Sequence, residues 1–279
     1  MHMLRQPITI MPVALRNDPM IEQSVTRAMV ARALADDRVC AVYQPVVDAR
    51  QMTRVAFHEA LVRLRTSSGR LMAPGQFLPA VAGTQLAVEL DCVVLRQALE
   101  AMQHRPTARI SVNIGVETLD SPMWMDLLTS FTADQPDLAF RLIVELTEDT
   151  SVLNHPNCGA FLHRLQQMGV TTALDDFGAG ATGFAWFREH RFDVVKIDGS
   201  FGDGLNQNRD SQVLVKALVD ISHHFEMMTV IEYIDSPADA ARAMRMGIDC
   251  MQGFLFGRPE PELRTHVPPT DIIRRRDAC

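Results

Sequence analysis

Two adjacent aspartates, Asp175 and Asp176, end an apolar stretch in the segment "TTALDDFGAG". Neighbouring carboxylates repel each other, so something in the folded protein must offset their charge. Successive side chains of a strand point in opposite directions, so two aspartates at its end can address two positions, such as two metal ions. The glycines that follow, Gly178 and Gly180, allow the next loop to turn tightly over such a site.

Polar residues also fall late in other apolar, strand-like segments of the sequence. They are Glu59, Asn113, Glu145, Lys196, Glu232 and Gln252. Taken alone, an acidic residue at the end of a strand is usually a helix N-cap or a solvated loop residue. Because the pattern recurs in seven segments, including the one that ends at the two aspartates, we expect a shared site.

The charges of this set indicate its chemistry. Two carboxylates about 4 Å apart repel by about 4 kcal/mol at an effective dielectric constant near 20. Several such pairs would exceed the stability of a typical domain, so protons or divalent cations must neutralise them. The ligands offered are hard oxygens, which favour Mg²⁺ or Mn²⁺ over zinc.

The histidines do not favour a zinc site. His223 and His224 are predicted in the middle of a helix without a partner at ligand spacing. His58 directly precedes Glu59 and should face the other way on a strand.

Strand-like and helix-like segments alternate along the chain, which predicts a parallel sheet with helices outside it. The predicted strands cover about 41–47, 55–62, 109–114, 141–147, 171–177, 192–198, 228–234 and 247–254. The predicted helices cover about 21–35, 84–103, 121–132, 157–168, 209–225 and 236–246. Eight strands predict an α/β fold of the TIM-like (β/α)8 barrel type, whose functional residues lie at the C-terminal ends of the strands.

Two connections depart from this alternation. The first two strands are joined by a few residues around Ala49 to Thr53, which predicts a hairpin and therefore one antiparallel strand. The segment 66–77 is rich in Gly, Ser and Pro, so we expect a loop with short helical turns.

Composition narrows the class of protein. The chain has 279 residues, of which 47% are hydrophobic, so we expect a sizeable core. Its net charge is −7, so we expect no general affinity for nucleic acid or anionic membranes. Its five cysteines form no CxxC pair, which is typical of a reducing, cytoplasmic location. No apolar run reaches the roughly 18 residues of a membrane span, and the N-terminus lacks the apolar core of a signal peptide.

The motifs, taken together, resemble those of the EAL-domain phosphodiesterases, which hydrolyse the bacterial second messenger cyclic di-GMP. The resemblance rests on "YQPVV", "HEALVR", "SVNI", "VELTE", "LDDFGAG", "VVKIDGSF", "VIEYID" and "QGFLFGRP", in the family's order over roughly residues 40–262. It implies a barrel with one antiparallel strand. We therefore expect an N-terminal extension at 1–20, an EAL domain at 21–264, and a solvated tail at 265–279.

The resemblance also implies two Mg²⁺ or Mn²⁺ ions and cleavage by water to linear pGpG. The implied metal ligands are Glu59, Asn113, Glu145, Asp175, Asp176 and Glu232. Asp175 should bridge the ions or bind the first, and Asp176 should bind the second. Lys196 should hold or help activate the attacking water, Glu59 counts among the catalytic residues, and Glu232 matches a glutamate that acts as ligand or base.

Other positions match residues around the substrate. Arg63 should bind a phosphate through its forked guanidinium, Gln44 and Leu61 should line the nucleotide groove, and Asp198 is a further implied substrate contact. Two supporting residues are Glu148, which would hold the loop after Asp176, and Gln252, which would order the metal and water surroundings. Cyclic di-GMP and a second copy of the chain, in a homodimer, are the implied partners.

The chain departs from the family's pattern at several supporting positions. Ala179 stands where the family usually has Thr, 181–183 reads Ala-Thr-Gly instead of a Tyr-Ser-Ser-like run, and Asp235 replaces a Glu. Tyr233 stands in place of a common Gly, and Gly199 in place of a common Arg.

These departures leave two alternatives open: a catalytically weak or inactive domain that acts as a cyclic di-GMP receptor, and a module that works through protein contacts. The presence of Glu59 and of both aspartates favours the enzyme. A glycerophosphodiesterase-like metal barrel would instead need histidines at its strand ends, and the predicted strand ends carry none.

Overall fold

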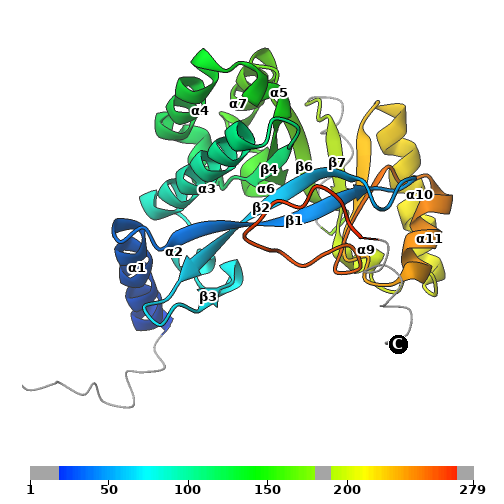
Figure 1. Cartoon of the computed structure of the whole chain (residues 1–279), viewed down its shortest axis with the longest axis horizontal. Helices are drawn as coiled ribbons and strands as arrows, with labels where there is room; N and C mark the ends of the chain where they lie inside the picture. The colour runs from blue at the N-terminus through cyan, green and yellow to red at the C-terminus, as the bar shows by residue number, and fades with distance from the viewer. Residues whose placement is uncertain (1–18, 180–189, 269–279) are drawn as a thin grey trace, which may run out of the picture.

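A closed ring of eight strands surrounded by helices forms the centre of the computed structural model, which describes residues 19–179 and 190–268 (Figure 1). Around the ring the strands follow the order β1-β9-β8-β7-β6-β5-β4-β2, and β2 pairs again with β1. The short β3 lies outside the ring at the edge of β2. The strands are β1 Val39–Asp48, β2 Val55–Arg65, β3 Leu71–Met72, β4 Ile110–Asn113, β5 Leu142–Thr147, β6 Thr171–Phe177, β7 Val194–Ile197, β8 Met228–Ile231 and β9 Cys250–Gln252.

The predicted barrel with one antiparallel strand is confirmed. β1 runs antiparallel to both of its neighbours, β2 and β9, whereas the other pairs within the ring are parallel. A tight connection joins β1 to β2, in which Asp48 Oδ1 accepts hydrogen bonds from the backbone N–H groups of Arg50 (2.8 Å) and Gln51 (3.1 Å). An aspartate that binds the backbone two residues further on is a common way to start such a turn.

The six predicted helices are all present, at nearly the predicted bounds. The helices are α1 Pro19–Ala35, α2 Leu78–Val81, α3 Gln85–His104, α4 Pro122–Asp134, α5 Asp137–Arg141, α6 Thr150–Leu153, α7 Cys158–Gln167, α9 Gly199–Gly202, α10 Arg209–His224 and α11 Pro237–Met246. The one-turn helices α2, α5, α6 and α9 were not predicted, because a single turn is too short to show helical periodicity. In the loop predicted at 66–77 a short helical turn is present at Pro74–Gln76, and β3 was not predicted.

Helix α11 illustrates how the sequence fixes the ends of these elements. The Ser236 hydroxyl accepts a hydrogen bond from the backbone N–H of Asp239 (3.1 Å), and Pro237 occupies the first turn. Gly247, with a φ of 92°, ends the helix in the left-handed conformation that glycine adopts without strain. A cap of this kind stabilises a helix by about 1 kcal/mol.

Inside the ring, an apolar layer lies next to a polar one. Val46, Phe57, Ile143, Ala173, Val194, Val230 and Cys250 form a buried apolar cluster. Two positions from each of these residues stands a polar residue on the same face of its strand or, for Glu232, directly after β8: Gln44, Glu59, Glu145, Asp175, Lys196, Glu232 and Gln252. The period of two therefore stacks a layer of polar side chains on an apolar floor.

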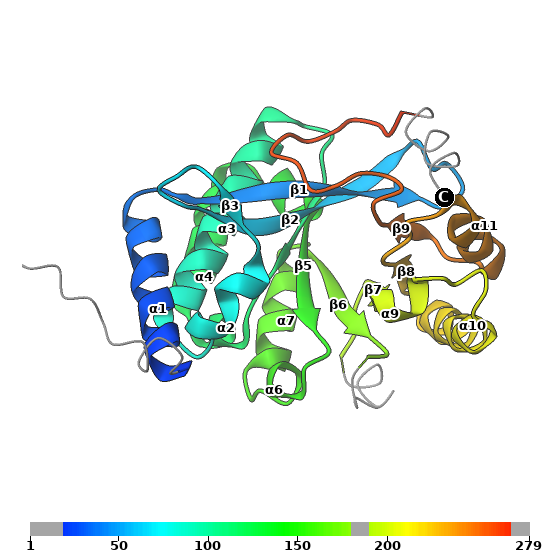
Figure 2. The same ribbon diagram turned by 90° about the horizontal axis from the view of Figure 1, so that it is seen from below.

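The polar layer lies toward the C-terminal ends of the parallel strands. In Figure 2 the arrowheads of β5 and β6 point away from β1, β2 and the C-terminal segment, toward the side on which α6 lies. Figure 1 therefore views the barrel from the side on which the parallel strands begin. None of the helices in 19–179 and 190–268 combines the length and apolarity that a membrane crossing requires.

The N-terminal extension up to residue 18, the segment 180–189 and the tail from residue 269 lie outside the described residues. The predictions for Gly180, for the run 181–183, for Cys279 and for most of the tail fall there. The other cysteines, Cys40, Cys92, Cys158 and Cys250, are free thiols, as expected.

Candidate active site

Lys196 lies at the centre of the polar layer and is 1% exposed. Its Nζ lies 2.8 Å from Glu145 Oε2, 2.9 Å from Asp175 Oδ1, 2.8 Å from Glu232 Oε1 and 3.6 Å from Glu59 Oε2. These carboxylates come from β2, β5, β6 and the residue after β8. One ammonium group therefore joins four parts of the ring.

Two amide side chains hold both oxygens of Glu59. Asn113 Nδ2 donates to Oε1 (2.7 Å), and Gln252 Nε2 donates to Oε2 (2.6 Å). Gln252 Nε2 also lies 3.3 Å from Gln44 Oε1, and Gln44 Nε2 donates to the carbonyl of Gly257 (3.2 Å). With β4, β9 and β1 included, all eight strands of the ring bring a polar group to the site, as the sequence predicted for seven of them.

Asp176 reaches the site by a different route from the one we predicted. Simple alternation would turn it away from Asp175, but the pairing of β6 with β7 shifts between Leu174 and Phe177, as at a β-bulge. Asp176 has a φ of 57°, which is uncommon for a residue other than glycine. A carboxylate oxygen of Asp176 consequently lies in a group with one from Asp175 and one from Glu232, all within 4.8 Å of one another.

The loop after Asp176 is held as predicted. Glu148, which is 4% exposed, accepts a hydrogen bond from the backbone N–H of Gly178 through Oε2 (2.8 Å). Gly178 has a φ of 98°, which explains why glycine follows Phe177.

Burial and repulsion shift the proton affinities of the site. Burial raises the pKa of Glu145 and of Glu232, although Lys196 opposes both shifts. Burial and the charge of Asp175 raise the pKa of Asp176 to about 6. Burial disfavours the charged form of Lys196, but Asp175 and the neighbouring glutamates outweigh it and raise its pKa.

The sequence predicted protons or divalent cations as the counter-charge of these carboxylates, and that prediction was incomplete. The structure adds the Lys196 ammonium, which offsets one negative charge. The remaining carboxylates still need protons or cations.

The arrangement fits divalent cations. Oxygens of Glu59, Glu145 and Asp175 form one group within 4.8 Å, and Asp175 belongs also to the group with Asp176 and Glu232. Glu145 Oε1 is buried and has no hydrogen-bond partner among the residues that the structure describes, as expected of an atom that binds a cation. These are hard oxygen donors, which suit Mg²⁺ or Mn²⁺, and neither group contains a histidine. The amide of Asn113 can present its oxygen by rotating about its last bond.

A cavity of about 300 Å³ opens beside this layer. Three of the four residues predicted to bind substrate, Gln44, Leu61 and Arg63, line it together with Glu59 and Glu232. The residues that sequence reasoning did not assign to its wall are Tyr233, Asp235, Gly253, Phe254 and Pro259. All five belong to the quoted motifs "VIEYID" and "QGFLFGRP", so the sequence contained the signal that could have identified them.

Asp198 is the fourth residue predicted to bind substrate, and the structure gives it another contact. Its side chain caps α9 by accepting from the backbone N–H of Ser200 (2.9 Å). It is not among the residues that line the cavity, so its role in substrate binding stays a prediction.

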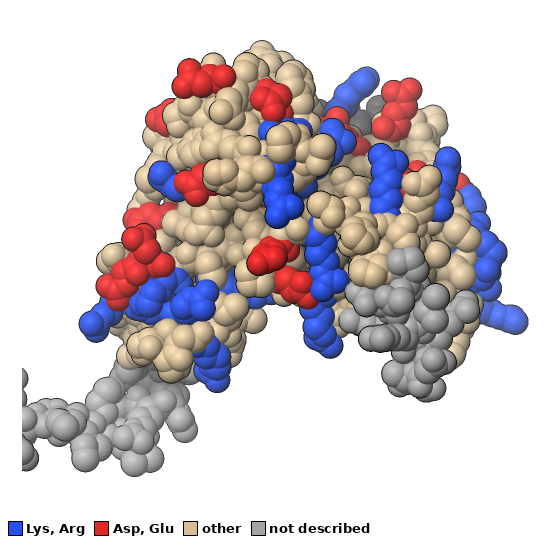
Figure 3. Space-filling model, viewed as in Figure 1, with Lys and Arg blue, Asp and Glu red and all other residues tan. Residues whose placement is uncertain are grey.

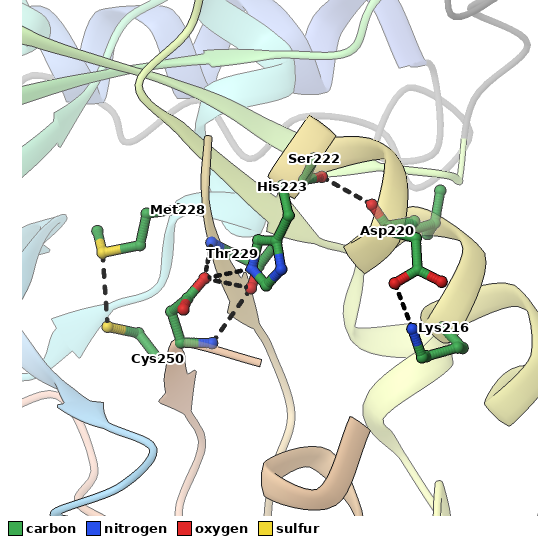
Figure 4. A network of polar contacts seen from close by, with 9 residues as sticks. Lys216, Asp220, Ser222, His223, Met228, Thr229 and Cys250 are labelled. Atoms are coloured by element: carbon green, nitrogen blue, oxygen red, sulfur yellow. Dashed lines mark hydrogen bonds and ion pairs between the residues drawn. The ribbon is translucent and has the colours of Figure 1, made fainter. Parts of the chain in front are cut away.

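The prediction for the adjacent histidines was wrong. His223 and His224 lie in the last turn of α10, not in its middle, and His223 Nε2 lies 2.9 Å from Asp249 Oδ2. Figure 4 shows His223 near Thr229, whose backbone N–H and hydroxyl both donate to the same carboxylate (2.9 Å each). This network ties α10 to the starts of β8 and β9, at the other end of the barrel. His58 faces away from the acidic layer, as predicted, and lines a cavity on that other side.

The described geometry agrees with known proteins. The EAL domain family model matches residues 27–259. The chain is 28% identical over 236 residues to "Cyclic di-GMP phosphodiesterase PdeB" of Shewanella oneidensis, covering 83% of this chain and 28% of that protein. It is 27% identical over 238 residues to "Cyclic di-GMP phosphodiesterase PdeF" of Escherichia coli, covering 84% of this chain and 32% of that protein. The chain thus spans about a third of the length of these relatives.

Solved structures agree with this match. "PaMucR Phosphodiesterase, c-di-GMP complex" superposes with a TM-score of 0.77 at 27% identity, covering 85% of this chain and 98% of that one. An EAL domain protein from Listeria monocytogenes gives a TM-score of 0.74 at 27% identity, covering 84% of this chain and 94% of that one. The ring of strands, the polar layer and these matches lead to one conclusion: this chain belongs to the EAL domain family.

Proposed function

We propose that this chain is a metal-dependent phosphodiesterase that hydrolyses cyclic di-GMP to linear pGpG. One observation carries the proposal: the buried Lys196 lies among four carboxylates, next to a cavity that Arg63 helps to line. The names of the relatives from Shewanella oneidensis and Escherichia coli, and the cyclic di-GMP bound in the PaMucR complex, support the choice of substrate.

The proposed ligands divide into two sets that share Asp175. Glu59, Asn113, Glu145 and Asp175 would hold one Mg²⁺ or Mn²⁺, and Asp175, Asp176 and Glu232 would hold the other. When bound, such ions offset the charge of the phosphodiester and lower the pKa of the attacking water.

The protein's own groups do the rest of the work. The Lys196 ammonium would donate a hydrogen bond to the attacking water and place positive charge where negative charge develops. The guanidinium of Arg63 would bind a non-bridging phosphate oxygen pair, and Gln44 and Leu61 would position the nucleotide. Gln252 would keep Glu59 oriented, through the hydrogen bond of 2.6 Å that it already makes.

A single incubation tests the proposal. The purified chain is mixed with cyclic di-GMP and Mn²⁺, and the products are separated by chromatography. We expect linear pGpG, and we expect Glu59→Gln to reduce its rate of formation at least a hundredfold. Glu100→Gln, an equal change at an exposed residue of α3, is the matched control and should leave the rate unchanged. Absence of product from the unmodified chain would overturn the proposal of hydrolysis.

A receptor that binds cyclic di-GMP without cutting it is the alternative that one observation favours. The large side chain of Tyr233, at a position where the family commonly has Gly, lines the cavity together with Glu232. Isothermal titration separates the cases, because a receptor binds the dinucleotide tightly and yields no product even with Mn²⁺. A chain that neither binds nor cuts it would be a protein-contact module.

We also propose that the chain acts in the cytoplasm as a homodimer. Exposed apolar side chains on α10, Val213 and Leu214, are 70% and 50% exposed and offer an apolar contact surface. Light scattering that finds a monomer at all practical concentrations would contradict the dimer.

A further inference from the structure

A second cavity, of about 690 Å³, lies at the opposite end of the barrel from the acidic layer. Its wall includes Phe57, Met228 and Cys250, at or near the starts of β2, β8 and β9, together with the residues before β4 and the segment 263–265. Glu59, on β2, faces the other end. We infer that this cavity is a binding site for a small molecule that carries phosphate groups, separate from the proposed catalytic site.

Arginines dominate the charged wall of this cavity. They are Arg50, Arg54, Arg105, Arg109 and Arg264, whereas the acidic residues that line it within the described part of the chain are Asp48 and Asp249. The chain as a whole has a net charge of −7, so the positive charge of this wall is opposite in sign to the net charge of the protein. Figure 3 views the molecule from this side and shows several Lys and Arg side chains, with a few Asp and Glu side chains among them, over the centre of the face, where Figure 1 draws β1, β2 and the C-terminal segment.

Three of the five arginines are already engaged: Arg54 by Asp48, Arg109 by the carbonyl of Phe140, and Arg264 by Glu260. Asp249 is engaged by His223 and Thr229, and Asp48 lies 3.7 Å from Arg54. Arg50 and Arg105 make no side-chain hydrogen bond or ion pair with any residue in 19–179 or 190–268. They come from the β1–β2 turn and the loop after α3, so two separate parts of the chain bring unengaged guanidinium groups to one cavity.

His58 supplies a second, independent observation. It lines the cavity and is 4% exposed, and within 19–179 and 190–268 its ring has at most one hydrogen-bond partner, the backbone of Arg264, so at least one ring nitrogen has none. A buried polar group left unpaired costs roughly 1–3 kcal/mol. A ligand in the cavity would supply the missing partner, since a neutral imidazole has one donor and one acceptor nitrogen.

The chemistry of the wall identifies the class of ligand. A guanidinium group binds two phosphate oxygens through parallel N–H groups, and several of them suit a ligand with two or more negative charges. Val55, Ala56, Phe57 and Leu263 add an apolar part to the wall. Small-molecule sites have volumes of roughly 300–1,000 Å³, so the cavity has room for a nucleoside diphosphate or triphosphate.

The test is isothermal titration with pyrophosphate, GTP and citrate as probes, in EDTA so that divalent ions do not contribute. We expect pyrophosphate and GTP to bind the unmodified chain. Arg50→Gln combined with Arg105→Gln should weaken both at least tenfold, and because both arginines are exposed the protein should still fold. Arg96→Gln combined with Arg245→Gln makes the same change of charge at exposed helix positions and should bind as the unmodified chain does.

A separate variant distinguishes the two ends of the barrel. Arg63→Gln alters the proposed catalytic cavity and should leave pyrophosphate binding unchanged. The inference is overturned if neither phosphate probe binds at millimolar concentration, or if the two double variants weaken binding equally. It is also overturned if Arg63→Gln abolishes binding. Equal binding of citrate and pyrophosphate would overturn the assignment to phosphate.

Discussion

The aromatic ring of Tyr233 lies over the backbone of Gly199, in the space that a side chain at position 199 would occupy. A Cβ atom built on Gly199 would lie 1.3 Å from Tyr233 Cδ2, so no residue other than glycine fits there without moving the ring. Tyr233 itself has a φ of 53° and is 59% exposed. Tyr233 and Gly199 are two departures from the family's pattern that lie apart in the sequence. They form one structural unit, because the Tyr233 ring fits only over a glycine at position 199.

This unit gives the first prediction. Gly199→Ala should push the Tyr233 ring out of place and alter the wall of the cavity, since overpacking of this kind costs about 1–3 kcal/mol. We expect KM for cyclic di-GMP to change several-fold, and we expect Tyr233→Gly in the same chain to remove the overlap and recover the stability. Steady-state kinetics and urea unfolding of the single and double variants measure both effects. Unchanged behaviour of the single variant would contradict the described contact.

Lys196→Met tests the central ion cluster. Removing one partner from a buried charge cluster typically destabilises a protein by about 3–5 kcal/mol, because the charges left behind are uncompensated. We expect a loss of that order in the free energy of unfolding and loss of hydrolysis. Mn²⁺ should stabilise the variant more than the unmodified chain, because cations then take over the role of the ammonium. Equal stability of the two chains without metal would be inconsistent with the cluster.

Asp176→Asn separates charge from backbone conformation at the β-bulge. Asparagine tolerates a positive φ about as well as aspartate, so the fold should lose little stability. The affinity for the second metal ion should fall, and hydrolysis with it by at least tenfold. Metal titrations followed by product formation provide the measurement. Asp176→Gly, which relaxes the same φ and also removes the carboxylate, should show the same loss, whereas full activity in either variant would exclude Asp176 as a ligand.

His58 gives the pH dependence of stability. Burial lowers its pKa from 6.5 to about 4, and the nearby backbone of Arg264 opposes this only in part. Above pH 6.5 the folded and unfolded chains both hold a neutral imidazole, so its contribution to stability is complete. As the pH falls from 6.5 to 4 only the unfolded chain gains a proton, so up to roughly 3 kcal/mol of stability is lost.

The comparison with His58→Phe isolates that effect, since Arg109, Arg264, Asp48 and Asp249 around the same cavity are unchanged in both chains. Urea unfolding between pH 7 and pH 4 should show a smaller loss in the variant. Equal losses of unfolding free energy in the two chains would contradict the prediction, because they would show that His58 takes up a proton as easily in the folded state as in the unfolded one.

Much of the fold followed from periodicity in the sequence. Ile143 and Glu145 stand on one face of β5, as Ala173 and Asp175 do on β6, so strand alternation alone brings these acidic residues to one layer. The tight connection around Ala49 was enough to predict the antiparallel strand. These features could be predicted because the direction of a side chain depends only on its position within its own strand.

The remaining features depend on contacts between distant parts of the chain. The sequence predicted that Lys196 and the carboxylates share a site, but not that the ammonium group pairs with four of them, because the ring must close before they meet. The bulge at Asp176 requires the pairing of β6 with β7, and the overlap of Tyr233 with Gly199 joins the ends of two strands. The arginine-lined cavity likewise gathers residues that lie more than 200 positions apart, from Arg50 to Arg264.

Anomalous diffraction from a crystal soaked with Mn²⁺ tests the central claim most directly. We predict two peaks at the rim of the barrel, one among Glu59, Glu145 and Asp175 and one among Asp175, Asp176 and Glu232, with an oxygen of Asp175 near both. A rim without manganese, in which Lys196 alone holds the carboxylates, would contradict the account.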